Sequence, residues 1–302
     1  MLGAVLAGGA GGAHAWRQAA ARPAVLFARG GDLYAVAVDG SRTARLTRTR
    51  VTEIDPEASR DGRWIAYVVD QPSISHRRFS ELWKMSVDGR RRIRLLRSRS
   101  LIRYPNWSGN GRTIYFAYYV DHTRWAECGA IFRVGSNGLG LRRLTRAAPR
   151  SHWGPSVSPD GRRVAFIDES GCEGGTTRQT VRVVDASGRP IREKFAQCIK
   201  WSPDSRKLAC PDWDGLFVVN RDGSGRRRLT PRAFHVGDPM WSPDGRWIAF
   251  VRTRRTKIRP YDEYVDAVYR VDPRGKRLRR LTRGAAYPNE PGSLSWLPRV
   301  PS

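Results

Sequence analysis

The sequence lacks any uncharged apolar stretch close to the roughly 20 residues that cross a bilayer as a helix, and its mean hydropathy is −0.55. This excludes a protein with several membrane-spanning helices. Acidic residues are also scarce, since 28 Asp and Glu stand against 55 Lys and Arg and leave a formal charge of +27 at pH 7. Only six of the basic residues are Lys, so arginine carries almost all of the positive charge.

Common catalytic and metal-binding motifs are missing as well. The sequence has no G-x-S-x-G nucleophile turn, no phosphate-binding P-loop, no H-E-x-x-H helix and no C-x-x-C pair. None of the five His has the paired H-x-x-x-H spacing of a metal site, although His76, His122, His152 and His235 all fall in predicted loops. We therefore expect no metal and no other cofactor.

Residues 2–13 form an uncharged run of Leu, Val, Ala and Gly, followed by the small-x-small sequence Ala13-His14-Ala15. This pattern predicts an export signal and a short linker over residues 1–22, with cleavage near Trp16. No Lys or Arg precedes the run, so an Ala/Gly-rich disordered tail is the alternative. Export would make the chain extracytoplasmic, whether periplasmic, associated with the cell wall or secreted.

Internal repetition is what the sequence has in abundance. The segment Trp-Ser-Pro-Asp-Gly-Arg-x-Ile-Ala-Phe at 241–250 has counterparts at 58–67, 107–116, 157–166 and 201–210. The copies begin 40 to 50 residues apart, which is the period of one β-propeller blade.

Two further elements repeat with the same period. An alternating apolar strand that ends in a tight turn occurs six times, at 33–40, 82–89, 131–138, 181–188, 216–223 and 268–275. A short Arg-Leu-Thr strand occurs at 45–47, 143–145, 228–230 and 280–282. Pro-Asp-Gly and Val-Asp-Gly are hairpin turn sequences, so each repeat predicts a four-stranded antiparallel unit.

The count of strands predicts an all-β fold, a six-bladed β-propeller of four-stranded antiparallel blades over residues 23–302. The first repeat lacks the Trp-Ser-Pro strand, and residues 293–298 supply an otherwise unpaired copy of it. We expect this C-terminal strand to close the first blade, which leaves no long unpaired edge between the two ends.

The Trp-Ser-Pro-Asp-Gly-Arg and Arg-Leu-Thr repeats resemble those of TolB-type β-propellers, over about residues 25–298. The resemblance covers the propeller and not the α/β domain that precedes it in TolB. It implies a fold rather than one function, because similar repeats serve as binding scaffolds, as the propeller of prolyl-oligopeptidase-like enzymes and in polysaccharide lyases.

One face of the predicted propeller carries the tight turns and the other carries the long loops, where binding residues concentrate. At the channel rim of the loop-rich face we predict a ligand-contact set of Glu53, Asp55, Arg103, Tyr104, Trp153, His235, Asp238, Asn289 and Glu290. The Asp-Pro pairs at 55–56 and 238–239 have a second interpretation, in which they only shape the entry of the chain into the inner strand.

The four cysteines allow three disulfide connectivities, and the sequence does not decide among them. Cys198 and Cys210 flank a hairpin turn symmetrically and are expected to stand opposite each other. Cys128 and Cys172 fall in loops of neighbouring blades on the same face. An even number placed in this way favours an oxidising compartment, with four unrelated thiols as the alternative.

Arginine runs at 90–92, 142–143, 226–228 and 277–280 follow the outer strands. They predict a solvated rim that protects blade edges from strand pairing; the alternative is adhesion to phosphate-rich polymers or anionic lipid. Nucleic acid is an unlikely target because no nucleic-acid motif or basic stripe with stacking aromatics occurs.

The sequence thus predicts a monomeric, non-enzymatic extracytoplasmic scaffold that binds a protein or an anionic envelope glycopolymer through its loop-rich channel face. The alternative is a self-contained propeller enzyme, a lyase or hydrolase acting on a polysaccharide or peptide. In that case His235, Asp238, Glu290 and Arg103 would be its acid–base and charge-stabilising groups.

Overall fold

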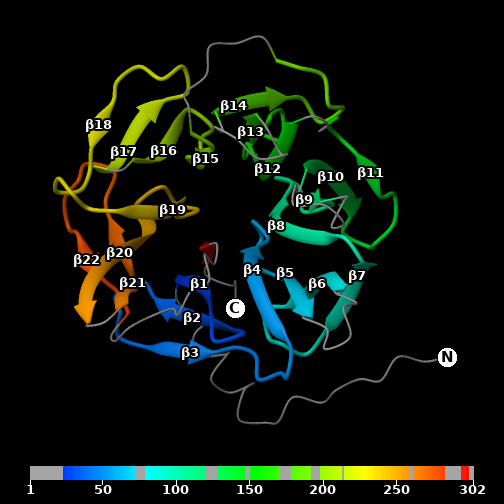
Figure 1. The fold of residues 1–302 in the computed structure, drawn as a ribbon, viewed down its shortest axis with the longest axis horizontal. Coiled ribbons are helices and arrows are strands. Elements are labelled where there is room, and N and C mark those ends of the chain that lie inside the picture. The colour runs from blue at the N-terminus through cyan, green and yellow to red at the C-terminus, as the bar shows by residue number, and fades with distance from the viewer. Residues whose placement is uncertain are drawn as a thin grey trace.

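The computed structural model describes residues 23–71, 79–119, 128–146, 150–170, 178–191, 198–212, 214–258, 261–282 and 294–298, with only the backbone described for 254–258 and 261–266. Its regular elements over these residues are all β-strands, and they form six antiparallel sheets arranged in a ring around a central channel (Figure 1). No helix long and apolar enough to cross a membrane occurs in this described part of the chain. The predicted all-β, six-bladed propeller is therefore confirmed.

In the first three blades the strands follow one another from the channel outward. Blade one contains β23 (Ser295–Leu297), β1 (Ala24–Arg29), β2 (Asp32–Ala37) and β3 (Thr43–Arg45). Blade two contains β4 (Thr52–Ala58), β5 (Trp64–Gln71), β6 (Phe79–Ser86) and β7 (Arg92–Ser98). Blade three contains β8 (Leu101–Trp107), β9 (Thr113–Tyr119), β10 (Gly129–Gly135) and β11 (Arg142–Arg143).

The other three blades have the same order. Blade four contains β12 (Arg150–Val157), β13 (Val164–Ser170) and β14 (Gln179–Val184). Blade five contains β15 (Lys200–Trp201), β16 (Lys207–Asp212), β17 (Gly215–Asn220) and β18 (Arg227–Arg228). Blade six contains β19 (Val236–Trp241), β20 (Ile248–Ile258), β21 (Tyr261–Val271) and β22 (Arg279–Arg280). In blade four a single bridge between Val184 and Pro190 occupies the place of the outer strand.

The ring is closed as predicted by the C-terminal strand. β23 pairs antiparallel with β1, with Leu26 opposite Ser295 and Ala24 opposite Leu297. The Ser295 hydroxyl also accepts the Ala58 backbone N–H at 2.9 Å, which ties this strand to blade two. The last strand of the chain therefore joins the first and second blades at the channel wall.

The serine and aspartate of each Trp-Ser-Pro-Asp-Gly copy build the turn itself. In blade six the Ser242 hydroxyl donates to Asp244 Oδ1 at 2.6 Å and accepts the Trp247 backbone N–H at 2.9 Å. Gly245 completes the turn at a φ of 69°, a conformation that glycine adopts without steric cost. The same serine bonds occur at Ser59, Ser108, Ser158 and Ser202.

The tryptophan of the repeat joins neighbouring blades. The indole Nε1–H groups of Trp107, Trp201 and Trp296 donate to backbone carbonyls of the preceding blade, at 3.0, 3.2 and 2.7 Å. All three rings are buried. Each therefore adds a hydrogen bond between blades to the apolar packing that fills the space between sheets.

The threonine of the Arg-Leu-Thr repeat secures the outer strand to the strand beside it. Thr47 Oγ1 accepts the Leu33 backbone N–H at 2.9 Å. Equivalent bonds join Thr145 to Ile131, Thr230 to Leu216 and Thr282 to Val268, at 2.9 to 3.0 Å. The repeated serine, tryptophan and threonine residues thus have structural roles in the scaffold.

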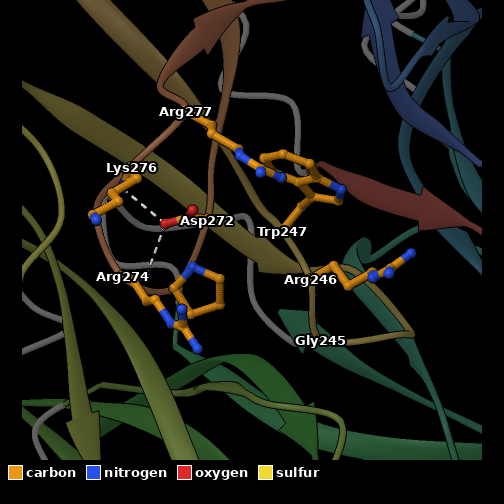
Figure 2. A pocket seen from close by; sticks show the side chains of 8 residues that line it. Gly245, Arg246, Trp247, Asp272, Arg274, Lys276 and Arg277 are labelled. Atoms are coloured by element: carbon orange, nitrogen blue, oxygen red, sulfur yellow. Dashed lines mark hydrogen bonds between the residues drawn. The ribbon is translucent and has the colours of Figure 1, made fainter.

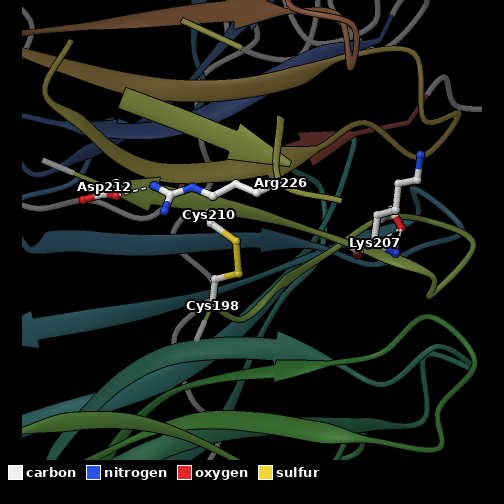
Figure 3. The surroundings of a disulfide bond; sticks show 6 residues. Cys198, Lys207, Cys210, Asp212 and Arg226 are labelled. Atoms are coloured by element: carbon white, nitrogen blue, oxygen red, sulfur yellow. Dashed lines mark hydrogen bonds and ion pairs between the residues drawn. A yellow bond between two sulfur atoms is a disulfide. The ribbon is translucent and has the colours of Figure 1, made fainter. Parts of the chain in front are cut away.

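A disulfide joins Cys198 to Cys210, with 5.2 Å between their Cα atoms (Figure 3). The expected pairing of these two cysteines is confirmed, although the ladder nearer the turn has a register that differs by one residue. Trp201 pairs with Leu208 and Lys200 with Ala209, which would set Ile199 opposite Cys210. The inner strands of four other blades shift by one residue at the corresponding place, and a shift of that size would set Cys198 opposite Cys210. Cys128 is also disulfide-bonded, and its predicted partner Cys172 lies outside the described residues.

Candidate functional site

Four inner strands bulge at one shared position, three residues before the end of the strand. The bulged residues have positive φ angles, which are 52° for Asp55, 55° for Tyr104, 60° for Gly154 and 44° for Asp238. Each of them precedes a proline. A positive φ costs of order 1 kcal/mol for a residue other than glycine, and bulges commonly re-aim side chains at functional sites. The Asp-Pro pairs thus shape the inner strand. Their bulges also set the direction of nearby side chains at the channel.

Tyr104 lies at the centre of this arrangement. Its backbone N–H donates to Asp55 Oδ2 at 3.1 Å, which links the bulges of blades two and three. Burial raises the pKa of the Tyr104 phenol to about 12, and the charges of Asp55 and Asp238 raise it as well. Asp238 lies in blade six, on the far side of the ring from Tyr104 in blade three (Figure 1). A phenol that responds to both carboxylates lies toward the channel.

Trp153 of blade four completes an aromatic pair with Tyr104. Their ring centroids are 6.0 Å apart with an interplanar angle of 39°, and both side chains are half-buried. The Trp153 indole N–H donates to Glu169 Oε2 at 3.1 Å, which fixes the orientation of the ring. The structure therefore brings Asp55, Tyr104 and Trp153 into contact, and the charge of Asp238 acts on the Tyr104 phenol; we call these four residues the bulge cluster.

Arg103 and Glu53 are used within the scaffold. Arg103 Nη2 donates to Asp70 Oδ2 at 2.8 Å. Glu53 is buried, and Arg92 Nη1 lies 3.4 Å from its Oε1. Burial raises the pKa of Glu53, while Thr47 and Arg92 oppose the shift. Glu53 is thus an interior carboxylate rather than a group that meets a ligand.

Of the remaining predicted residues, the structure describes His235 and does not describe Asn289 or Glu290. His235 is exposed, and its backbone carbonyl accepts the Thr253 N–H at 3.1 Å. Asn289 and Glu290, like His76 and His122, lie outside the described residues.

His152 belongs to a buried polar network. Its Nδ1 lies 2.8 Å from the Thr145 hydroxyl and its Nε2 lies 3.4 Å from Asp168, which also pairs with Arg150 and Arg182. Burial lowers the pKa of His152, and the nearby Asp168 opposes that shift. Over the residues with described side chains, no three His, Cys, Asp or Glu gather as metal ligands would.

The opposite end of the channel, where the inner strands finish at the Pro-Asp-Gly turns, holds a cavity of about 140 Å³. We call this end the turn mouth and the other end the loop mouth. Each blade lines the cavity with the residue that directly precedes the Trp position of its repeat. These residues are Glu57, Asn106, Ser156, Lys200, Met240 and Ser295. Our sequence reasoning missed this ring, although five of its six members are polar at one fixed place in the repeat.

Glu57 is the ionisable centre of that ring. Its Oε1 accepts the Asn106 side-chain N–H at 3.1 Å. Burial raises the pKa of Glu57 to about 7, while Lys200 and Ser295 oppose the shift. The turn mouth therefore holds a carboxyl group that changes charge near neutral pH.

No family model matches the sequence. Curated relatives match over parts of the chain, among them one from Bacillus subtilis and one from Chlorobium luteolum. An uncharacterized peptidase of Bacillus subtilis, YuxL, is 30% identical over 102 residues, which are 30% of this chain and 16% of that protein. A TolB homolog of Chlorobium luteolum is 27% identical over 131 residues, which are 41% of this chain and 29% of that protein. The matched parts span less than a third of either relative.

Solved structures match over most of the chain. TolB from Acinetobacter baumannii superposes with a TM-score of 0.61 at 17% identity, over 92% of this chain and 67% of that one. An oligogalacturonate lyase from Vibrio parahaemolyticus superposes with a TM-score of 0.52 at 13% identity, over 82% of this chain and 74% of that one. At these identities the likeness concerns the fold, and the chain has the fold of a TolB-like six-bladed β-propeller.

Proposed function

We propose that this propeller is a non-enzymatic, extracytoplasmic binding scaffold whose loop mouth receives a segment of a partner protein. The observation that carries the proposal is the bulge cluster, in which Tyr104 lies beside Trp153 and within electrostatic reach of Asp55 and Asp238. Aromatic side chains dominate the binding energy of many protein interfaces. Asp55 is buried and holds the Tyr104 backbone, so the half-buried Asp238 carboxylate is the group that suits a partner with basic or hydrogen-bond-donating groups.

The cysteines support the proposed extracytoplasmic compartment. Disulfides persist mainly in oxidising compartments, and Cys128, Cys198 and Cys210 are all oxidised. This supports an extracytoplasmic location together with the predicted export signal at 1–22. An anionic envelope glycopolymer is the second partner class, favoured by the net charge of +27 rather than by the chemistry of the bulge cluster.

The proposal is tested by substitution at the loop mouth with a matched control at the other end of a blade. Tyr104→Ala and Trp153→Ala should each weaken the capture of an envelope protein by at least about tenfold, since buried interface aromatics are worth about 2 kcal/mol or more. Trp64→Ala is the control, because Trp64 is an equally half-buried aromatic at the turn side of blade two. Unchanged capture by the Tyr104 and Trp153 variants, at native stability, would contradict the proposal.

The enzyme alternative has support from the match to the Bacillus peptidase and from the lyase fold. Asp238 is then the acid–base group to replace, because its carboxylate acts on the Tyr104 phenol across the channel. We expect no turnover of oligogalacturonate or of peptide substrates by the purified chain. Turnover that is abolished by Asp238→Asn and retained by Trp64→Ala would establish the enzyme instead.

A further inference from the structure

A groove of about 670 Å³ lies on the turn side of blade six, away from the channel. It runs between two turns, one formed by Gly245 and Arg246 ahead of β20 and the other by 272–277 after β21. Four cationic side chains line it, from Arg246, Arg274, Lys276 and Arg277 (Figure 2). All four are exposed, so each is available to a ligand.

Acid does not balance this charge within the groove. Asp272 is the one carboxylate among its lining residues, and Asp272 Oδ1 accepts the backbone N–H groups of Arg274 and Lys276 at 3.0 and 2.7 Å (Figure 2). That carboxylate oxygen is therefore occupied in holding the turn. The groove presents four positive charges to solvent against this single negative one.

A fifth cation lies against the wall of the groove. Arg270 stacks on Trp247, which lines the groove, with its guanidinium carbon 3.6 Å from the ring centroid. The Arg270 Nε and Nη1 atoms are buried and have no hydrogen-bond partner within the described structure. Burial lowers the pKa of Arg270, and Arg279 and Arg277 lower it further while Asp39 opposes them. A half-buried guanidinium among other cations makes this surface favourable for a bound anion.

Blade two has a similar cation stacked on a Trp ring, but the turn beside it carries a different charge. Lys84 stacks on Trp64 at 4.2 Å, and each cation occupies the same place in its sheet, since Lys84 pairs with Ala66 and Arg270 with Ala249. The turn after β6, however, has Asp88 where blade six has Arg274. Asp88 lies 3.8 Å from Arg90 and so partly neutralises that turn. The stacked pair is part of the scaffold. Blade two has Ser86 where blade six has Asp272, so each turn carries one aspartate, and blade six has one more cationic side chain.

We propose that the blade-six groove binds the phosphate groups of a phosphate-rich polyanion. Guanidinium groups match phosphate oxygens through paired hydrogen bonds, and several cations spread along one groove suit a chain of anions better than one isolated anion. The site lies outside the channel and does not depend on the function proposed for the loop mouth.

Short-chain inorganic polyphosphate is the probe, titrated calorimetrically into the full chain. Arg274→Asp places in blade six the residue that blade two carries, and it should weaken binding about tenfold, the equivalent of about 1.4 kcal/mol. Arg90→Asp in blade two changes the net charge equally and should weaken binding less than about threefold. Arg246→Ala is a second variant on an exposed turn, with an expected loss in the same direction as Arg274→Asp.

The pattern across the variants decides the proposal. Loss confined to the Arg274 and Arg246 variants supports a built site in blade six. Equal weakening by Arg274→Asp and Arg90→Asp, or no binding by the wild-type chain, would overturn it, because general attraction to a basic protein explains those results. Vesicles containing phosphatidylglycerol are the second arm. Binding to vesicles without binding to polyphosphate would overturn the proposal of a polymer ligand and assign the groove to lipid headgroups.

Discussion

The two mouths of the channel are made from the same inner strands, yet they differ in how far the repeat determines them. At the turn mouth five copies contribute a serine-bonded turn, and three of the Trp side chains bond the preceding blade. At the loop mouth one equivalent position varies among five blades, which carry Asp55, Tyr104, Gly154, Cys198 and Asp238 there. Positions that repeat hold the ring together, and positions that vary are free to give it a specific surface.

Removing a repeated tryptophan should have the largest effect on stability. Trp107→Ala deletes a buried ring and its bond to the Glu57 carbonyl, and we expect it to lower the free energy of unfolding by about 3–5 kcal/mol. Trp153→Ala at the loop mouth is the matched control and should cost less than half as much, because that ring is half-buried. Urea denaturation measures both. Equal losses would remove the distinction between the two mouths.

The disulfide tests whether a residue at a varied position can also stabilise the scaffold. In blade five, Cys198 occupies the position that corresponds to Asp55, Tyr104, Gly154 and Asp238 in other blades. Replacing both Cys198 and Cys210 by Ser should lower the free energy of unfolding by about 3 kcal/mol, since the cross-link restricts the conformations of the unfolded chain. Equilibrium unfolding with and without reductant checks this. A variant as stable as the oxidised wild type would show that the bond adds nothing to the scaffold.

The raised pKa of Glu57 at the turn mouth predicts that the stability of the protein depends on pH. Its pKa is raised to about 7 by burial from an ordinary value of 4.5, so the folded chain holds a proton that the unfolded chain has lost between those values. Stability should therefore fall as pH rises from 4.5 through 7, by no more than about 3 kcal/mol. Glu57→Gln should remove that part of the slope in urea denaturation at pH 5 and pH 8. An identical slope in the variant would contradict the assignment.

A single turn serine should have the smallest effect. Ser242→Ala removes the bonds to Asp244 and to the Trp247 backbone, and we expect a loss of about 1 kcal/mol in the free energy of unfolding. Partner binding at the loop mouth should stay unchanged, which a parallel capture assay measures. A loss of capture without a loss of stability would mean that the turn face also contacts the partner.

The sequence was sufficient for the scaffold because repetition exposes scaffold residues. Blade number, closure by residues 293–298 and the turn sequences all follow from positions that recur for one physical reason, such as the Ser242–Asp244 turn. The bulge cluster was found only in part. Asp55 and Tyr104 could be placed at the rim, but the positive φ angles that set their direction arise from pairing with the next strand and leave no local pattern beyond the proline that follows.

Residues whose partners come from distant positions were the ones that sequence reasoning misplaced. Glu53 was expected at the rim, and it lies inside because Arg92 of the outer strand reaches it. Glu57 was passed over, and its environment comes from Asn106, Lys200 and Ser295 in three other blades. Such contacts join positions far apart in the sequence, so no local motif marks them.

The most direct test of the central claim is photo-crosslinking at the two mouths in the organism that makes the protein. A photoreactive phenylalanine analogue at position 104 reports on the loop mouth, and the same analogue in place of Arg60 reports on the turn mouth. We predict a covalent adduct with an envelope protein from position 104 that Trp153→Ala removes, and none from position 60. An adduct from position 60 alone would contradict the account, since the partner would then bind the repeated face rather than the varied one.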